Sequence, residues 1–502
     1  MPWFRKKILL IEPPFYRLYK ESLSLVRFPL SLGYLSSAIC QATDWEVKAF
    51  NADYSPKNEE PGVSVAFLAK QGFDNYLHNL RDASGPVWQE IRSVIREHRP
   101  AVVGISAKTQ NFPAACAIAG IAKEIDRQIL VIVGGPHPTM VRHKTLECLD
   151  IDIAVYGEGE ETIAELLLAL DSGRGPEGVP GIGYRMDGEV RETPPRKYIG
   201  DLDRLGFPHE TAAEVLINYE HYPLQAFGNV FATRGCPFNC FFCGSRYIWS
   251  HRTRFRSPAN VAAEIRKLMA KGLRSIHFDD DTFGVNSKYI KDLCDALVKH
   301  CPGLRWSCET HVNLVNDTTI GWMKSAGCRN IALGIESGNN EILKKIRKGF
   351  TIEEALQAVK LIKKAGIGVS TFFMVGFPFE TISTLNDTIN VIKKLKCDRI
   401  LYSIFTPYPG TEAYYYCLQE GLITEDDDLS LYNHQSPLNC FTPYIPPDKF
   451  RELASNLEQI VDRKNYLSKL GRMVSLDSLR HSKDRGLKET IIQGLQVLLK
   501  RR

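Results

Sequence analysis

Residues 229–243 read Asn-Val-Phe-Ala-Thr-Arg-Gly-Cys-Pro-Phe-Asn-Cys-Phe-Phe-Cys, a short apolar run that leads directly into three cysteines. The run predicts a β-strand, so the cysteines follow a strand end. The first ten residues of the chain are not typical of a signal peptide, which favours a cytoplasmic location. In that reducing compartment, three clustered cysteines indicate a metal site and not disulfides.

Cys236, Cys240 and Cys243 favour an iron–sulfur cluster over zinc. A structural zinc site needs a fourth ligand, and the nearby His251 lies in a polar loop without a second ligand. A [4Fe–4S] cluster normally has four cysteine ligands. Three cysteines would leave one iron open, and chemistry can occur at an open iron.

The region around these cysteines, residues 226–415, alternates between strand-like and helix-like patterns. Five helical patterns separate six apolar runs, which are NVFATRG, SIHFDD, RWSCETHVN, IALGIES, VSTFFMVGFP and RILYSIFTPYPG. Six β/α units in a row predict a partial (β/α)6 barrel of the TIM type. Because barrel chemistry lies at the carboxyl ends of the strands, the cysteines occupy a catalytic position.

Residues 5–175 also alternate, with five short apolar runs separated by helical patterns. This alternation predicts a doubly wound, Rossmann-like α/β domain with a parallel sheet. The third, fourth and fifth runs end in loops that contain Ser106 and Thr109; Gly134, Gly135 and His137; and Gly157, Glu158 and Gly159. Each loop alone is an ordinary turn, but three at one sheet edge favour a binding site. The first run is not followed by GxGxxG, which argues against a dinucleotide.

The rest of the chain is less specific. Residues 176–225 are rich in glycine and proline and predict a linker, and residues 416–502 predict a helical domain that covers the substrate. The composition, with 44% hydrophobic and 24% charged residues, is that of a soluble globular protein. No apolar stretch is long enough to predict a membrane span.

The net charge of +5 comes from the last part of the chain. Residues 451–502 hold twelve Lys or Arg and six Asp or Glu, so the remainder is close to neutral. This distribution argues against a nucleic-acid enzyme. We expect the basic tail to be a solvated helix, and a peripheral contact with acidic lipid heads or an acidic partner is the alternative.

The CxxxCxxC segment, with Phe242 before its last cysteine, resembles the radical S-adenosylmethionine (SAM) superfamily. The stretches Phe278–Phe283 and Gly334–Gly338 are similar to its acidic motif and its ribose-contacting motif. The segments GGPHPT and YGEGE resemble signatures of a branch in which a cobalamin (B12)-binding domain precedes the barrel. The resemblance covers roughly residues 5–415.

The resemblance implies a role for each matching residue. Cys236, Cys240 and Cys243 would bind a [4Fe–4S] cluster, and its open iron would bind SAM. The implied SAM contacts are Phe242 to adenine, Asp280 and Asp281 to the amino group, and Glu336 to a ribose hydroxyl. The implied cobalamin contacts are Ser106, Thr109, Gly134, Gly135, His137, Gly157, Glu158 and Gly159. Where many relatives carry a basic residue, this chain has His311, to which we assign no catalytic role.

The implied reaction is methylation of an unactivated carbon. None of the twelve histidines has an aspartate two residues before it, so the Asp-x-His-x-x-Gly motif of histidine-ligated cobalamin is missing. One SAM would supply the methyl group through cobalamin, and a second would supply the radical that activates the substrate. The expected partners are a small-molecule or lipid-like substrate and an electron donor such as flavodoxin or ferredoxin.

Three alternatives stay open at this point. The enzyme could form a ring or oxidise its substrate without methyl transfer. It could be a methylthiotransferase, whose second cluster would need Cys40, Cys116 and Cys148, although Cys40 and Cys116 fall in helical patterns typical of buried thiols. It could also be an inactive cobalamin carrier, which the three cluster cysteines disfavour.

Overall fold

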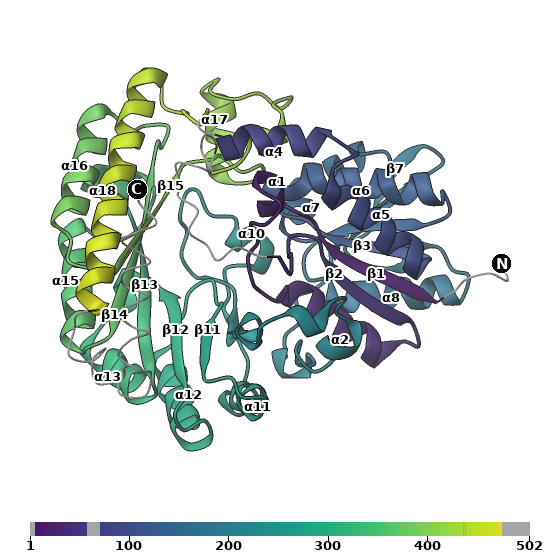
Figure 1. Cartoon of the computed structure of the whole chain (residues 1–502), viewed down its shortest axis with the longest axis horizontal. Helices are drawn as coiled ribbons and strands as arrows, with labels where there is room; N and C mark the ends of the chain where they lie inside the picture. Colours follow the sequence, from purple (N-terminus) through teal and green to yellow (C-terminus); the bar gives the residue numbers. More distant parts are fainter. Residues whose placement is uncertain (1–5, 58–70, 435, 437, 474–502) are drawn as a thin grey trace.

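The computed structural model describes residues 6–57, 71–434, 436 and 438–473. It contains two large sheets that face each other across the molecule, one built from the first part of the chain and one from the later part (Figure 1). The short helix α10 (Ser245–Trp249) lies between them. No helix within the described ranges is long and apolar enough to cross a bilayer.

The first sheet has seven strands in the order β2-β1-β3-β4-β5-β6-β7. The first five, in chain order, are parallel: β1 (Lys7–Glu12), β2 (Glu46–Asn51), β3 (Val102–Ser106), β4 (Leu130–Gly134) and β5 (Ile153–Val155). Helices α2 (Leu30–Ala42) and α8 (Glu160–Asp171) pack on one face, and α4 (Gln71–Arg81), α5 (Pro86–His98) and α6 (Phe112–Ile125) pack on the other. The prediction of a doubly wound domain is confirmed.

Strand β1 shows why its sequence is an unbroken apolar run. Ile8 and Leu10 belong to the core on one side of the sheet, and Leu9 and Ile11 belong to the core on the other. A strand with helices on both faces has no side that contacts water, so both sets of alternating residues are apolar.

The linker predicted over 176–225 is wrong for part of its length. Strands β6 (Ile182–Met186) and β7 (Glu189–Glu192) form a hairpin that extends the first sheet, with β6 antiparallel to β5. The two residues of the turn, Asp187 and Gly188, both have positive φ, at 53° and 82°. An Asp-Gly pair is a strong hairpin signal. The density of glycine and proline around it concealed that signal, so the first domain continues past residue 175.

The second sheet has six strands in the order β15-β14-β13-β12-β11-β8, all parallel to their neighbours. They are β8 (Asn229–Val230), β11 (Ser275–Phe278), β12 (Arg305–Thr310), β13 (Cys328–Glu336), β14 (Gly368–Val375) and β15 (Arg399–Ile404). The helices between them are α11 (Pro258–Ala270), α12 (Ser287–His300), α13 (Asp317–Ser325), α14 (Asn340–Lys345), α15 (Ile352–Lys364) and α16 (Ile382–Lys394). The predicted six-unit partial barrel is confirmed.

Local sequence signals set the start of these barrel helices. At α15, the Thr351 hydroxyl accepts a hydrogen bond from Glu354 N, and the Glu354 carboxylate accepts one from Thr351 N. This capping box satisfies two amide groups that a helix start leaves without partners. The helix then places Ala355, Val359 and Ile362 in the core.

The C-terminal part of the chain returns to the first domain. After α17 (Glu412–Gln419), the Asn433 amide donates a hydrogen bond to the Tyr19 hydroxyl, and Arg81 lies 3.6 Å from Asp428. Helix α18 (Pro447–Met473) then packs along β15 and α16. The boundary predicted at 415/416 falls inside α17. The basic tail lies largely beyond residue 473, outside the described residues.

The remaining elements are short. They are α1 (Tyr16–Tyr19), α7 (Pro136–Val141), α9 (Ala212–Val215), the antiparallel pair β9 (Thr233–Arg234) and β10 (Arg254–Phe255), and the 3-10 turns η1 (Thr109–Asn111), η2 (Arg142–Glu147), η3 (Pro176–Gly178), η4 (Leu202–Arg204), η5 (Tyr219–His221), η6 (Leu224–Phe227), η7 (Val312–Leu314) and η8 (Leu429–Leu431).

Candidate active site

A cavity of about 500 Å³ lies at the carboxyl edge of the first sheet. Six of the predicted cobalamin contacts line it, namely Ser106, Gly134, Gly135, Gly157, Glu158 and Gly159. The second domain closes it with Phe231, Arg234, Ile248, Trp249 and Asp279. The cavity is therefore shared by the two domains, and its second-domain wall comes in part from the strand that leads into the cysteines.

Several glycines of the sheet edge line this cavity, among them Gly134, Gly135, Gly157 and Gly159. At Gly135, with φ of 110°, an added Cβ would lie 2.8 Å from the carbonyl oxygen of Ala107. At Gly157, with φ of 80°, an added Cβ would meet nothing within 4 Å, because the residue borders open space. These backbone positions let a ligand approach the sheet edge closely. Such a floor fits a wide, flat ligand such as the corrin ring of cobalamin.

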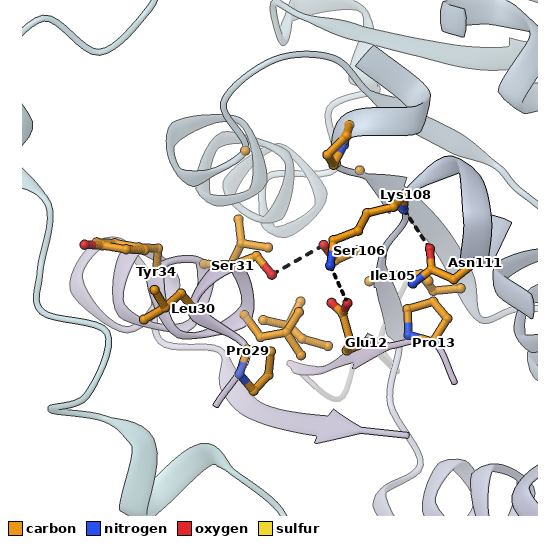
Figure 2. A pocket seen from close by; sticks show the side chains of 18 of the residues that line it. Glu12, Pro13, Pro29, Leu30, Ser31, Tyr34, Ile105, Ser106, Lys108 and Asn111 are labelled. Carbon is orange, nitrogen blue, oxygen red and sulfur yellow. Dashed lines mark hydrogen bonds and ion pairs between the residues drawn. The ribbon is translucent and has the colours of Figure 1, made fainter. Parts of the chain in front are cut away.

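Polar side chains stand at one end of the cavity, and of these only Ser106 was predicted from the sequence (Figure 2). Lys108 Nζ lies 3.4 Å from Glu12 Oε1, and Lys108 N donates a hydrogen bond of 2.7 Å to Asn111 Oδ1. The Ser106 and Ser31 hydroxyls lie 3.5 Å apart. Glu12 could have been predicted from the sequence, because it is the last residue of β1 and therefore lies at the same sheet edge as the glycine loops. These donors and acceptors suit a ligand with amide groups at its periphery.

Two predicted cobalamin contacts do not line the cavity. His137 is buried in α7, where its Nδ1 lies 3.1 Å from the Thr109 hydroxyl and its ring stacks on Phe112 at 4.0 Å. Burial lowers the pKa of His137 to about 3, so the ring is neutral. Among the described residues that line the cavity there is no histidine.

The cysteine loop follows β9 and is held at several points. Phe241 N donates to Ile346 O at 3.1 Å, and Cys243 N donates to Cys240 O at 3.2 Å. The Phe238 ring stacks on His311 with centroids 3.7 Å apart and planes 14° apart. His311 is thus a packing partner of the cysteine loop, which accounts for its place at the end of β12.

The three cysteines of this loop are half-buried. Burial raises the pKa of Cys243 to about 12 and raises the pKa of Cys240. Buried thiols of this kind become thiolates when a cation compensates their charge. Within the described ranges, no three His, Cys, Asp or Glu side chains are placed to hold a single metal ion. Three thiols in one loop are the kind of donor set that holds an iron–sulfur cluster.

The acidic stretch after β11 supports the cysteine loop. Asp280 Oδ1 accepts a hydrogen bond of 2.8 Å from Ala232 N, and its Oδ2 accepts one of 2.7 Å from the Thr233 hydroxyl. Both carboxylate oxygens are therefore used within the protein. Burial raises the pKa of Asp280 to about 7. Asp280, which was predicted as a SAM contact, therefore stabilises the segment before the cysteines through hydrogen bonds.

The next two residues reach the loop itself. Asp281 Oδ2 lies 3.3 Å from Gly235 N, and burial raises the pKa of Asp281. The Thr282 hydroxyl lies 3.2 Å from the Cys236 sulfur. Unlike Asp280, Asp281 accepts a backbone hydrogen bond through one carboxylate oxygen only, and the Ser245 side chain is another neighbour of this carboxylate.

Glu336 occupies a strained position beside the cysteines. It ends β13 with φ of 69°, at a register shift between β13 and β14, and its Oε1 lies 3.4 Å from the buried Lys348 Nζ. Positive φ in a non-glycine residue is costly and often marks a functional site. Phe242 lies nearby in the loop, with its ring 5.8 Å from that of Phe377. The two predicted SAM contacts therefore lie on elements that adjoin the cysteines.

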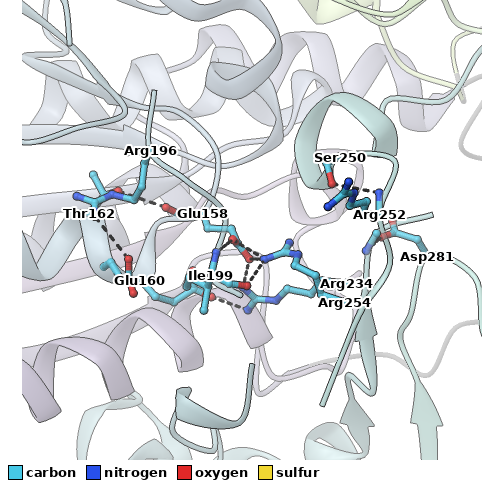
Figure 3. Close-up of polar contacts among 12 residues, drawn as sticks. Glu158, Glu160, Thr162, Arg196, Ile199, Arg234, Ser250, Arg252, Arg254 and Asp281 are labelled. Atoms are coloured by element: carbon cyan, nitrogen blue, oxygen red, sulfur yellow. Dashed lines mark hydrogen bonds and ion pairs between the residues drawn. The ribbon is translucent and has the colours of Figure 1, made fainter. Parts of the chain in front are cut away.

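Glu158 is used differently from the prediction. Its carboxylate contacts Arg234 and Arg254 at 2.8 and 2.7 Å, which join the first domain to the segment before and after the cysteine loop (Figure 3). It borders the cavity, but its two oxygens are already paired with protein groups. The sequence YGEGE gave no indication of these partners, because both arginines lie about 80 residues or more away.

The cysteines needed for a second cluster are not gathered. Cys116 and Cys148 are close enough to interact, and both pack against the core on the α6 side of the first sheet. Cys40 lies exposed on α2, which covers the opposite face. This arrangement does not support the methylthiotransferase alternative.

Two family models match the chain. The radical SAM superfamily matches residues 230–392, and the B12-binding domain matches residues 63–167. The cysteine loop lies in the first range, and the glycine loops lie in the second.

Individual proteins agree with these matches. The chain is 34% identical to an uncharacterized methyltransferase of Pyrococcus horikoshii over 83% of this chain and 84% of that protein. It is 30% identical to the anaerobic magnesium-protoporphyrin IX monomethyl ester cyclase of Rubrivivax gelatinosus, over 70% of this chain and 63% of that protein. The fold is similar to that of TsrM from Kitasatospora setae, a radical SAM methyltransferase, with a TM-score of 0.70, 18% identity, and coverage of 91% of this chain and 89% of that one.

Proposed function

Because this chain belongs to the radical SAM superfamily, in the branch with an N-terminal B12-binding domain, we propose that it methylates a carbon atom of a small molecule. The observation that carries the proposal is the shared cavity. Its floor is the glycine edge of the first sheet, and its second-domain wall includes Arg234, two residues before Cys236. A methyl carrier and a radical source placed in this way can act on one substrate.

The bound groups would supply the reactive chemistry: the cluster with SAM supplies a radical that removes hydrogen from carbon, and cobalamin supplies the methyl group. The chain's own residues bind and orient. Cys236, Cys240 and Cys243 are proposed as the cluster ligands. Phe242 would contact the adenine, and Asp281 would meet the SAM amino group. Glu336, held by Lys348, would take a ribose hydroxyl.

The cobalamin site is proposed to lack a protein imidazole below the cobalt. The missing Asp-x-His motif and the commitment of His137 to Thr109 and Phe112 both support this. Cobalamin bound without an imidazole from this chain would supply a methyl group in a form that suits an unactivated carbon. Electron paramagnetic resonance of the cob(II)alamin form checks it, and splitting by a protein nitrogen would contradict it.

The reductant is proposed to be a flavodoxin or a ferredoxin in the cytoplasm. Lys344, Lys345 and Arg347 are exposed at the end of α14 and in the turn that follows, where Arg347 pairs with Glu412. This turn adjoins the cysteine loop, because Ile346 O accepts the hydrogen bond from Phe241 N. Such donors are usually acidic, so a basic surface beside the cluster supports this choice.

The test is anaerobic incubation of the reconstituted protein with trideuteromethyl-SAM, a reductant and candidate small molecules, followed by mass spectrometry. A product that has gained a trideuteromethyl group supports the proposal. The second candidate function, ring formation without methyl transfer, is favoured by the 30% identity to the Rubrivivax cyclase. It predicts 5′-deoxyadenosine and an unlabelled product. Absence of SAM cleavage with every substrate would argue against both functions.

A further inference from the structure

Two arginines on either side of the cysteine loop contact two glutamates of the first domain. Arg234 in β9 and Arg254 in β10 are register partners. Arg234 Nη1 lies 2.8 Å from Glu158 Oε1, and its Nη2 lies 2.5 Å from Glu160 Oε1. Arg254 Nη1 lies 2.7 Å from Glu158 Oε2. We call these four residues the interdomain ion cluster, and Figure 3 shows their side chains converging.

The interdomain ion cluster is largely buried and borders the cavity. The side chain of Arg234 is 6% exposed, and those of Glu158 and Glu160 are 2% and 8% exposed. The Arg234 guanidinium also lies 5.1 Å from the ring centre of Tyr34 and 5.2 Å from that of Trp249. Removing such charges from water is costly, so a buried ion pair is weak evidence for added stability.

The interdomain ion cluster lies between the cavity and the cysteine loop. Glu158 directly follows Gly157, which borders the cavity floor, and Arg234 precedes Cys236 by two residues. One guanidinium thus joins the loop beside the cobalamin cavity to the strand that carries the cysteine loop. Arg234, Glu158 and Glu160 also form part of the cavity wall.

We propose that Arg234 is a positioning residue that sets the distance and orientation between the cobalamin cavity and the cysteine loop. The inference rests on the proposed function, because this spacing matters when both cofactors act on one substrate. A planar guanidinium can hold two carboxylates at once in a fixed geometry. A lysine keeps the charge but acts as a single point donor. Arg234→Lys therefore keeps both cofactors bound and misaligns them.

The matched control is Arg196→Lys. Arg196 Nη2 lies 2.5 Å from Glu165, and its Nη1 lies 3.5 Å from Glu161. Its side chain is 10% exposed, close to the value for Arg234. It is thus another arginine held by two glutamates, but its partners lie on α8 and do not reach the cysteine loop.

The first measurement needs no cofactor. Hydrogen–deuterium exchange of the full-length apoprotein follows peptides that contain residues 157–160 and 233–236. In Arg234→Lys, both peptides should exchange faster together, by about fivefold or more, because the contact that joins them is loosened. In Arg196→Lys, both should match the wild type. Unchanged exchange in Arg234→Lys would overturn the inference.

The second measurement uses the reconstituted holoprotein. Electron paramagnetic resonance reports the dipolar interaction between cob(II)alamin and the reduced cluster, which depends on their separation. The interaction should weaken or spread over several values in Arg234→Lys, with iron and cobalamin contents equal to the wild type. With SAM as the probe, the ratio of S-adenosylhomocysteine to 5′-deoxyadenosine should fall about tenfold or more, because small misplacements cost much rate.

The outcomes separate positioning from a merely structural role. Loss of iron or cobalamin from Arg234→Lys, or an equal fall in both SAM products, would show that the residue only holds the fold, and would overturn the inference. If Arg234→Lys is insoluble, Glu160→Gln is measured in the same way. A wild type that fails to transfer methyl groups would end the proposed function, while the exchange and dipolar measurements would still decide the role of Arg234.

Discussion

The two sheet edges at the centre of this molecule are built in different ways. The edge of the first sheet presents backbone, with Gly134, Gly135 and Gly157 where side chains would otherwise stand. The edge of the second sheet presents carboxylates: Asp280 accepts a hydrogen bond from Ala232 N in a neighbouring segment, and Glu380 accepts one from Gly376 N in its own loop. A wide, flat ligand needs an edge without side chains, whereas a loop of thiols needs side chains that hold it.

We expect the largest effect on activity when a thiol at the edge of the second sheet is removed. Cys240→Ala should lose the cluster and all SAM cleavage, because two cysteines are too few to retain it. Iron content and 5′-deoxyadenosine formation under anaerobic conditions measure both. Cys116→Ala is the control and should keep about four irons per chain. Full cleavage by Cys240→Ala would refute the assignment, and eight irons in the wild type would restore the methylthiotransferase alternative.

The next effect tests the glycine edge. Gly135→Ala should lower the free energy of unfolding by roughly 3 kcal/mol, because its Cβ would press on the Ala107 carbonyl at positive φ. Gly157→Ala should cost only about 1 kcal/mol, since the site is open, yet it should weaken cobalamin binding because the new methyl group enters the cavity. Thermal unfolding and titration with hydroxocobalamin measure the two properties. If Gly135→Ala and Gly157→Ala lost equal amounts of stability and of cobalamin affinity, the expected difference between the two glycines would be contradicted.

A smaller effect distinguishes bracing from SAM binding at Asp280. Asp280→Ala leaves Ala232 N and the Thr233 hydroxyl without their acceptor and should cost roughly 2 kcal/mol of stability. Asp280→Asn keeps an acceptor for the amide, and its NH2 can donate to the hydroxyl, so stability and SAM affinity should stay near the wild type. If Asp280→Asn loses SAM affinity as strongly as the alanine variant does, the carboxylate charge contacts SAM after all.

The smallest effect is a pH dependence of the carboxylate edge. Burial raises the pKa of Glu380 to about 7, above its value in the unfolded chain. The folded state then binds more protons, so this contribution to stability is present at low pH and is lost as pH rises through about 7. Glu380→Gln should remove this dependence, with a relative gain on the order of 2 kcal/mol at pH 8. Thermal unfolding midpoints from pH 5 to 8 measure it, and parallel curves would contradict it.

Sequence patterns predicted the strands and the cysteine loop well, for a physical reason. Burial on both faces makes a run such as Ile8–Ile11 continuously apolar, and three thiols after a strand have few other uses. The hairpin at Asp187 was missed because its strands are short and its outer strand is exposed. Patterns of this kind show which residues share a strand, but not which side chain meets which.

The sequence did not show which charged side chains pair with each other. Glu158 and Asp280 were assigned to cofactors, because an acidic residue in a glycine-rich or strand-end loop is typical of a ligand contact. Each is instead paired with groups 41 or more positions away in the chain, such as Ile199, Arg234 and Thr233. His137 was predicted as a cobalamin contact, but Phe112 and Thr109 enclose it. Such partners are set by packing within each domain and between the two domains.

The return of the chain to its first domain has a consequence for the order of synthesis. A nascent chain that has released β1 to β5 already holds the glycine floor of the cavity. Its second-domain wall, from Phe231 to Asp279, follows only later, and Asn433, which contacts Tyr19, comes later still. Because domains fold as they emerge, the floor is open to solvent for the time needed to translate the barrel. The cavity is thus a site that is made early and enclosed late.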